Sequence, residues 1–135
     1  MRNHSLMRFA NGALHCVHAA TASAQAPACK APQKPMLDIE LLLGRGTAGD
    51  ARWRQFLARE VTPRFPDGLT VYETYGQWRD PARNLIVREK SRVMRIIVAA
   101  DAPAQDRIVA VAEAYKKKFN QKSVGIVTRT ACVSF

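Results

Sequence analysis

The sequence predicts an α+β fold in which two helices cover one face of a single antiparallel sheet. Three observations support this prediction. Segments of β character open and close the folded part, two segments with helical periodicity lie between them, and two β-rich runs meet across a polar turn. The expected order is strand, helix, strand, strand, helix, strand. The economical packing of that order is a ferredoxin-like βαββαβ sandwich, with the strands in the order four-one-three-two across the sheet.

The length and the composition favour one small basic domain. With 135 residues, 47% of them hydrophobic, the chain can bury a single core. No apolar run approaches the roughly 20 residues that a membrane-spanning helix needs. The 21 Lys and Arg exceed the 11 Asp and Glu and give a formal charge of +10, which permits nucleic-acid binding by counterion release. We favour a solvated basic surface instead, because no folded stretch is both basic and interleaved with aromatic residues.

The first 26 residues differ from the rest of the chain. Small residues dominate from Ala19 onward, and Ala24-Gln25-Ala26 has the form of a secretory cleavage site. Polar residues interrupt the apolar region, so the signal peptide is a weak one, and a disordered leader or a misplaced start codon is the alternative. We expect an exported protein, periplasmic or secreted, with a Pro/Ala/Lys linker at residues 27–35 and one domain at residues 36–135.

Removal of this leader would change the chemistry that is available to the protein. All three histidines lie in it, at positions 4, 15 and 18. The mature chain could then use no histidine as a base or a metal ligand, and we expect neither a metal nor a cofactor. Cys29 and Cys132 would remain, and an even pair in an oxidising compartment predicts a disulfide. The topology agrees, because Cys29 precedes the first strand and Cys132 lies near the end of the antiparallel fourth strand beside it.

The first half of the domain predicts one strand and one helix. Residues 36–43 alternate in polarity, so that Asp38 and Glu40 should face away from the side that carries the leucines. A helix is expected from Asp50 to Thr62, since Pro63 disfavours helical geometry in the residue before it. Apolar residues at helical spacing should form its buried face, namely Trp53, Phe56 and Leu57.

The second half predicts a hairpin, a helix and a last strand. Residues 69–78 and 85–98 are β-rich and flank a polar loop at residues 80–84. The charged segment 88–92 suggests that this end of the hairpin projects beyond the core. A helix is expected over residues 103–119, with Asn120 as its C-terminal cap and a strand at 123–133 after it. The expected core residues of this helix are Ile108, Val111 and Tyr115.

Two polar groups deserve a functional hypothesis. The first comprises Asp38 and Glu40, which should lie near Arg95 and Arg129 on the sheet face away from the helices. Cross-strand charge pairing on a wet face explains this group. The alternative is a homodimer that packs through the open sheet face.

The second group surrounds the hairpin and the turn that leads into it. It comprises Arg64, Asp67, Gln77, Trp78, Arg88 and Glu89. In the structural interpretation, Arg64 pairs with Asp67 or Glu89 and Trp78 clamps the hairpin. In the functional interpretation, Arg64 or Arg88 holds an anion in a pocket and Trp78 stacks on the ligand.

Several motifs of the folded part resemble the bacterial domain of unknown function 3574 family. The most specific is Pro63-Arg64-Phe65-Pro66-Asp67-Gly68-Leu69-Thr70-Val71. Others are Leu42-Leu43-Gly44-Arg45, Gly76-Gln77-Trp78, Arg88-Glu89 with Ser91, and Cys132-Val133-Ser134-Phe135. The resemblance covers about residues 37–135 and implies a small exported protein, although this chain lacks a lipidation motif. It supplies no activity and no catalytic residues.

Two classes of function therefore remain open. We favour an exported binding or interaction module for an unknown small ligand. The alternative is a cofactor-independent enzyme of the dimeric α+β barrel type, with a carboxylate or a tyrosine as its acid–base group. An enclosed pocket with a buried carboxyl of shifted pKa would favour the enzyme, and a shallow surface with paired carboxylates would favour the binding module.

Overall fold

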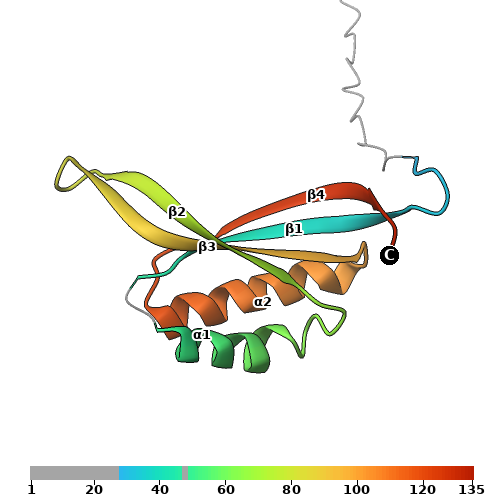
Figure 1. The fold of residues 1–135 in the computed structure, drawn as a ribbon, viewed down its shortest axis with the longest axis horizontal. Coiled ribbons are helices and arrows are strands. Elements are labelled where there is room, and N and C mark those ends of the chain that lie inside the picture. Colours follow the sequence, from blue (N-terminus) through green and yellow to red (C-terminus); the bar gives the residue numbers. More distant parts are fainter. Residues whose placement is uncertain (1–27, 47–48) are drawn as a thin grey trace, which may run out of the picture.

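The computed structural model describes residues 28–46 and 49–135, so the expected leader lies outside the described residues. The elements follow the predicted order (Figure 1). They are β1 (Lys34–Gly44), α1 (Asp50–Phe56), the π-helical segment η1 (Leu57–Val61), β2 (Thr70–Asp80), β3 (Leu85–Ala99), α2 (Ala102–Phe119) and β4 (Gly125–Val133).

The four strands form one antiparallel sheet in the order β2-β3-β1-β4. This is the predicted order, read from the opposite edge. Both helices lie on the same face of the sheet (Figure 1). The ferredoxin-like α+β sandwich is therefore confirmed.

The first helix has an irregular second half. It was expected to run as one regular helix to Thr62, but η1 has π-helical hydrogen bonding, and the Thr62 amide donates to the Leu57 carbonyl at 2.9 Å. Leu57, predicted to be a core residue, is only partly buried and packs against the edge of the core. The reason is its position beside the face that Phe56 and Val61 present to the sheet, where both are fully buried.

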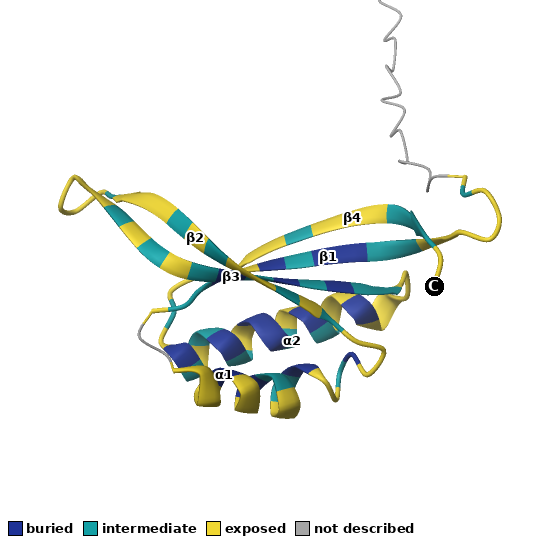
Figure 2. Ribbon diagram, viewed as in Figure 1, coloured by how far each residue is buried: buried dark blue, intermediate teal, exposed yellow. Residues whose placement is uncertain are grey.

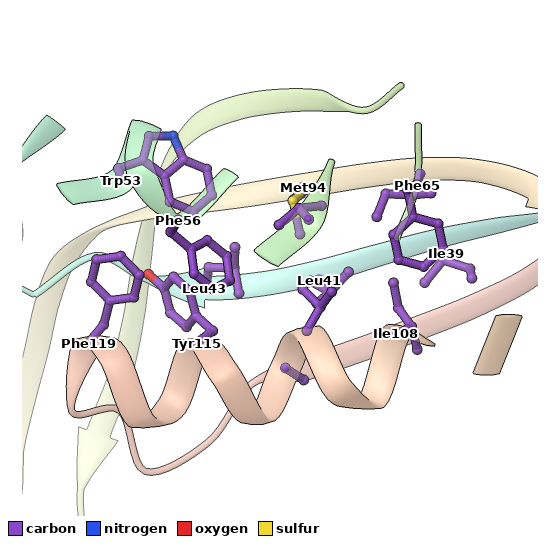
Figure 3. Packing of buried hydrophobic residues seen from close by; sticks show 14 residues of the cluster. Ile39, Leu41, Leu43, Trp53, Phe56, Phe65, Met94, Ile108, Tyr115 and Phe119 are labelled. Carbon is purple, nitrogen blue, oxygen red and sulfur yellow. The ribbon is translucent and has the colours of Figure 1, made fainter. Parts of the chain in front are cut away.

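Four aromatic side chains gather at one end of the core between helices and sheet, and Phe65 lies among aliphatic side chains at the other end (Figure 3). At the aromatic end, Phe56 meets Tyr115 edge to face with ring centroids 5.3 Å apart, and it stacks on Trp53 at 5.8 Å. The predicted residues Ile108, Val111 and Tyr115 are buried on α2. Figure 2 shows that the buried positions of α2 follow its sheet-facing side. Asn120 ends this helix in the left-handed conformation, at φ 53°, as predicted.

The predicted disulfide joins Cys29 to Cys132, with their Cα atoms 5.4 Å apart. It links two segments that are 103 positions apart in the sequence. β1 begins at Lys34, within the expected linker, because Lys34 and Pro35 already pair with Val133 and Cys132 of β4. The bridge therefore ties the segment before β1 to the end of its neighbouring strand.

The β2–β3 hairpin extends past the helices, and its tip has no layer over either face (Figures 1 and 2). Its turn is closed by Asp80, whose Oδ1 accepts hydrogen bonds from the amides of Ala82 at 2.9 Å and Arg83 at 3.4 Å. The expected projection of residues 88–92 holds for only part of that segment. Arg92 is 2% exposed, because its side chain lies on the helix-facing side of β3 with Met94 and Ile96.

Candidate functional site

A hollow of about 520 Å³ lies at the base of the projecting hairpin. It forms where β1 ends at Gly44 and β4 begins at Gly125, so that β2 and β3 continue without these neighbours. We call it the hairpin hollow. It is open to solvent, and its walls combine apolar, aromatic and polar side chains, among them Leu42, Tyr75, Gln77, Trp78, Glu89, Ser91, Arg92, Val93, Gln121 and Ser123.

Two strand glycines, Gly76 and Gly125, line this hollow. A Cβ at Gly76 would lie 2.8 Å from Ser91 Oγ, and a Cβ at Gly125 would lie 3.0 Å from the Leu42 side chain. In both cases the contact is with a neighbouring side chain, so a Cβ at either position would require that side chain to shift. Glycine within a strand often marks the close approach of a ligand or another backbone.

A second hollow, of about 460 Å³, adjoins the first and shares Thr74, Tyr75 and Arg92 with it. We call it the cationic hollow. Four of its lining residues are positively charged and two are negatively charged: Arg45, Arg54, Lys90 and Arg92, with Asp50 and Glu73.

Four of these side chains form a closed ring of ion pairs. Arg45 bonds Asp50 at 2.6 Å and lies 3.5 Å from Glu73, while Arg92 bonds Glu73 at 2.6 Å and Asp50 at 2.9 Å. Each residue comes from a different segment: the loop after β1, the first turn of α1, β2 and β3. The Arg92 guanidinium also lies over the Trp53 ring, 4.6 Å from its centroid. This ion ring joins the helix layer to the base of the hairpin.

Sequence reasoning missed all four members of the ion ring. A signal for Arg92 was present, because it shares the alternation that places Met94 and Ile96 on the helix-facing side of β3. Read with that parity, an arginine at position 92 must point toward the helices. Its partners required the position of α1 relative to the sheet, which strand alternation does not provide.

Tyr115 holds the end of β1, where Gly44 lines the hairpin hollow. Its hydroxyl donates to the Gly44 carbonyl at 2.8 Å. Burial of this side chain raises the pKa of Tyr115 to about 12. The phenol therefore keeps its proton at neutral pH and serves as a hydrogen-bond donor to the end of β1.

The structure brings together part of the predicted site. Gln77, Trp78 and Glu89 line the hairpin hollow, and Trp78 is 48% exposed. Gln77 lies directly opposite Arg88 in the β2–β3 register, and Gly76 lies opposite Glu89. Arg88 is exposed on the hairpin and lines none of the described hollows.

The structure places the other two predicted residues elsewhere. Arg64 and Asp67 line a small hollow of about 240 Å³ beside the turn that leads into β2, whereas Gln77 and Trp78 lie toward the other end of that strand. The expected pairing of Arg64 with Asp67 or Glu89 was wrong. Arg64 bonds the carboxylate and the carbonyl of Glu60 at 3.1 and 2.6 Å, because the helical spacing of four residues brings these two side chains together.

The first predicted polar group is present on the open sheet face. Arg95 forms a bidentate bond with Asp38 at 2.7 and 3.0 Å, and Arg129 bonds Glu40 at 3.0 Å and Asp38 at 3.4 Å. We call these four residues the open-face cluster. The hydrogen bonds from Arg95 hold the pKa of Asp38 below its ordinary value, against the opposing effect of burial. Asp38 is therefore an ionised, paired carboxylate.

Within residues 28–46 and 49–135, no group of three or more His, Cys, Asp or Glu side chains could hold a metal ion. In the same part of the chain, no helix is long and apolar enough to cross a membrane.

The fold and the site define a small ferredoxin-like protein with an open ligand-sized hollow under a projecting hairpin. Residues 38–135 match the family described as a protein of unknown function, DUF3574. The chain belongs to this family, and the resemblance seen in its motifs is confirmed. No curated protein matches the chain in sequence.

Several solved structures share the fold. A phage SAM lyase in complex with S-methyl-5'-thioadenosine superposes with a TM-score of 0.57 at 13% identity, over 73% of this chain and 90% of that one. The B. subtilis GlnK–ATP complex gives 0.53 at 13% identity, over 72% and 82%. CutA from Synechococcus elongatus gives 0.53 at 12% identity, over 76% and 82%. At these identities the likeness shows the fold alone.

Proposed function

We propose that this protein is an exported ligand-binding module whose ligand occupies the hairpin hollow. The observation that carries the proposal is a half-exposed Trp78 at a hollow of about 520 Å³ with glycines on its surface. Hollows of roughly 300–1,000 Å³ with apolar walls and a few polar groups are typical of small-molecule sites. Trp78 offers an aromatic face for stacking, and Glu89 and Ser91, which the register places on the same face of the hairpin, offer hydrogen-bonding groups.

The chemistry of the buried groups supports binding rather than catalysis. The buried carboxylate of the described residues, Asp38, is paired with two arginines on the open sheet face. Its lowered pKa is the opposite of what a general acid needs. Tyr115 keeps its proton, and its hydroxyl donates a hydrogen bond to the Gly44 carbonyl. Glu89 is the carboxylate that lines the hairpin hollow, so the alternative enzyme would have to use it.

Export is supported by the disulfide between Cys29 and Cys132, since such bonds persist in oxidising compartments. Protein isolated from its host should begin near Pro27, as read by N-terminal sequencing. A cellular pool that retains Met1 would contradict export.

We also propose that the protein forms a homodimer through the open sheet face. The open-face cluster has two cations and two anions, so its charges can complement those of a second copy. Tyr72 lies on the same face and is 46% exposed, so it supplies apolar area beside the cluster. Sedimentation analysis should show a dimer that Tyr72→Glu dissociates. A monomer at high protein concentration would contradict the dimer.

The ligand site is tested by fluorescence titration with S-methyl-5'-thioadenosine, a flat-ring compound that a structure of the same fold holds. We expect saturable quenching of tryptophan emission that disappears in Trp78→Ala. Ile86→Ala is the matched control, because Ile86 is 56% exposed on the same hairpin but lies outside the hollow and outside the proposed dimer interface. Both variants should unfold within about 0.5 kcal/mol of the wild type, since neither side chain is buried. Equal loss of binding in both variants would contradict the site.

A further inference from the structure

The cationic hollow has more positive charge than its own residues neutralise. Within the described residues the ion ring pairs Arg45 and Arg92 with Asp50 and Glu73, which leaves that ring neutral. Two more cations, Arg54 and Lys90, line the same hollow. Neither has an ion-pair partner among the residues that the structure describes, so the hollow has a surplus of two positive charges.

The paired arginines are held by several contacts, whereas the surplus cations Arg54 and Lys90 are exposed to solvent. Arg92 is 2% exposed and is held by two carboxylates and the Trp53 ring. Arg45 is mostly buried, with 21% of its side chain exposed. Fixed guanidinium groups with spare N–H donors recognise oxyanions by paired hydrogen bonds, and flexible lysine adds a mobile charge. A charge surplus beside partly buried arginines favours a bound anion, because screening by water is weaker there.

We propose that the cationic hollow binds an oxyanion, the phosphate or sulfate group of the ligand whose ring lies in the hairpin hollow. This inference rests on the proposed ligand-binding function, which it extends to a ligand class. Thr74, Tyr75 and Arg92 line both hollows. Strand alternation places Trp78 and Lys90 on opposite faces of the hairpin, so the proposed ligand passes around β2, the edge strand of the sheet, from one hollow to the other. The ligand is then an aromatic compound with an ionised ester group, held by Arg54 and Lys90 at its charged end and by Trp78 at its ring.

The two tryptophans allow each hollow to be observed separately. The chain contains only Trp53 and Trp78, and the first lines the cationic hollow while the second lines the hairpin hollow. In a Trp78→Phe variant the emission of Trp53 reports on the cationic hollow alone. Titration with inorganic phosphate at constant ionic strength, with chloride as the matched salt, should change this emission saturably.

Charge-removing variants test whether the response is local. In the Trp78→Phe background, the double change Arg54→Gln with Lys90→Gln should weaken phosphate binding by about 10-fold or more, since two charge-assisted contacts are lost. The control Arg79→Gln with Arg83→Gln removes the same charge from the hairpin tip, outside the hollow, and should change the Kd less than about 2-fold. Equal weakening by the two pairs, or no saturable phosphate response, would overturn the inference.

Failure of this inference is distinguishable from failure of the proposed function. Adenosine and adenosine 5'-monophosphate share a ring and differ in the phosphate. If both inferences hold, wild-type protein binds the monophosphate more tightly, and Arg54→Gln with Lys90→Gln removes the difference. If adenosine binds and the phosphate adds nothing, the oxyanion inference is wrong and the ring site stands. In a third outcome, phosphate changes the Trp53 emission saturably, but Trp78→Ala alters the binding of neither adenosine nor its monophosphate. The ring site is then wrong, the oxyanion site stands, and its link to a ring ligand is overturned.

Discussion

The open-face cluster and the ion ring have the same composition, two arginines and two carboxylates, but opposite arrangements. In the open-face cluster the carboxylate of Asp38 is buried and its arginines are partly in solvent. In the ion ring Arg92 is buried and its carboxylates are mostly exposed. The buried anion Asp38 is already neutralised by two partly exposed arginines, so the open-face cluster needs no further ion. A buried cation flanked by exposed acids and two unpaired cations leaves a site that can accept a further anion.

The largest expected effect on stability comes from removing the Phe56 side chain, which packs beneath Trp53 and the ion ring. Phe56 is fully buried and stacks on Trp53, which in turn contacts Arg92. Phe56→Ala should lower the free energy of unfolding by about 3–5 kcal/mol, measured by chemical denaturation. Leu57→Ala is the matched control on the same helix and should cost less than about 2 kcal/mol, because Leu57 is only partly buried. Equal losses would mean that the buried face of the helix has been misassigned.

Arg92→Met separates the packing role of this arginine from its charge. The loss of its contact with Trp53 should cost about 1–2 kcal/mol, and Asp50 and Glu73 are exposed enough to be hydrated instead. Arg54→Met, in the same hollow but without an ion pair, should change stability by less than about 0.5 kcal/mol. Thermal and denaturant unfolding of both variants measures the contrast. A loss of unfolding free energy as large as that of Phe56→Ala would indicate that the ion ring mainly stabilises the fold.

The smallest effect should appear in the open-face cluster as a dependence on pH. The pKa of Asp38 lies below its ordinary value of 3.8 in the folded protein. The unfolded chain therefore takes up this proton more readily, and stability falls as the pH drops through about 4 and below. The contribution is about 1 kcal/mol, because Arg95 and Arg129 are partly in solvent. Asp38→Asn should remove this part of the acid dependence, and identical profiles for both proteins would contradict the pairing.

The contrast also explains what the sequence could and could not predict. The alternation in β1 placed Asp38 and Glu40 on the open face, and antiparallel pairing brought Arg95 and Arg129 opposite them. Element order predicted the sheet topology, and the expected leader and that topology together predicted the Cys29–Cys132 bridge. These inferences need only periodicity and the handedness and order of connections.

The ion ring needs information of another kind. Its members come from four segments, and their meeting depends on how α1 is docked against the hairpin, which is set by side-chain packing. The same limit applies to Arg64, for which pairing with Asp67 or Glu89 was considered but which bonds Glu60 of η1, four residues earlier. Trp78 and Gln77 were identified because an exposed aromatic beside a polar loop is visible in the sequence. The hollow around them, made by the ends of β1 and β4, was not.

The most direct test of the central claim compares the two clusters in one experiment. Backbone amide signals of ¹⁵N-labelled protein are followed by NMR during titration with adenosine 5'-monophosphate. The proposed site predicts saturable shifts for Gly76, Lys90, Arg92 and Gly125, with Asp38, Glu40 and Arg129 unchanged. Shifts centred on the open-face cluster, or no saturable shift at the hairpin base, would contradict it.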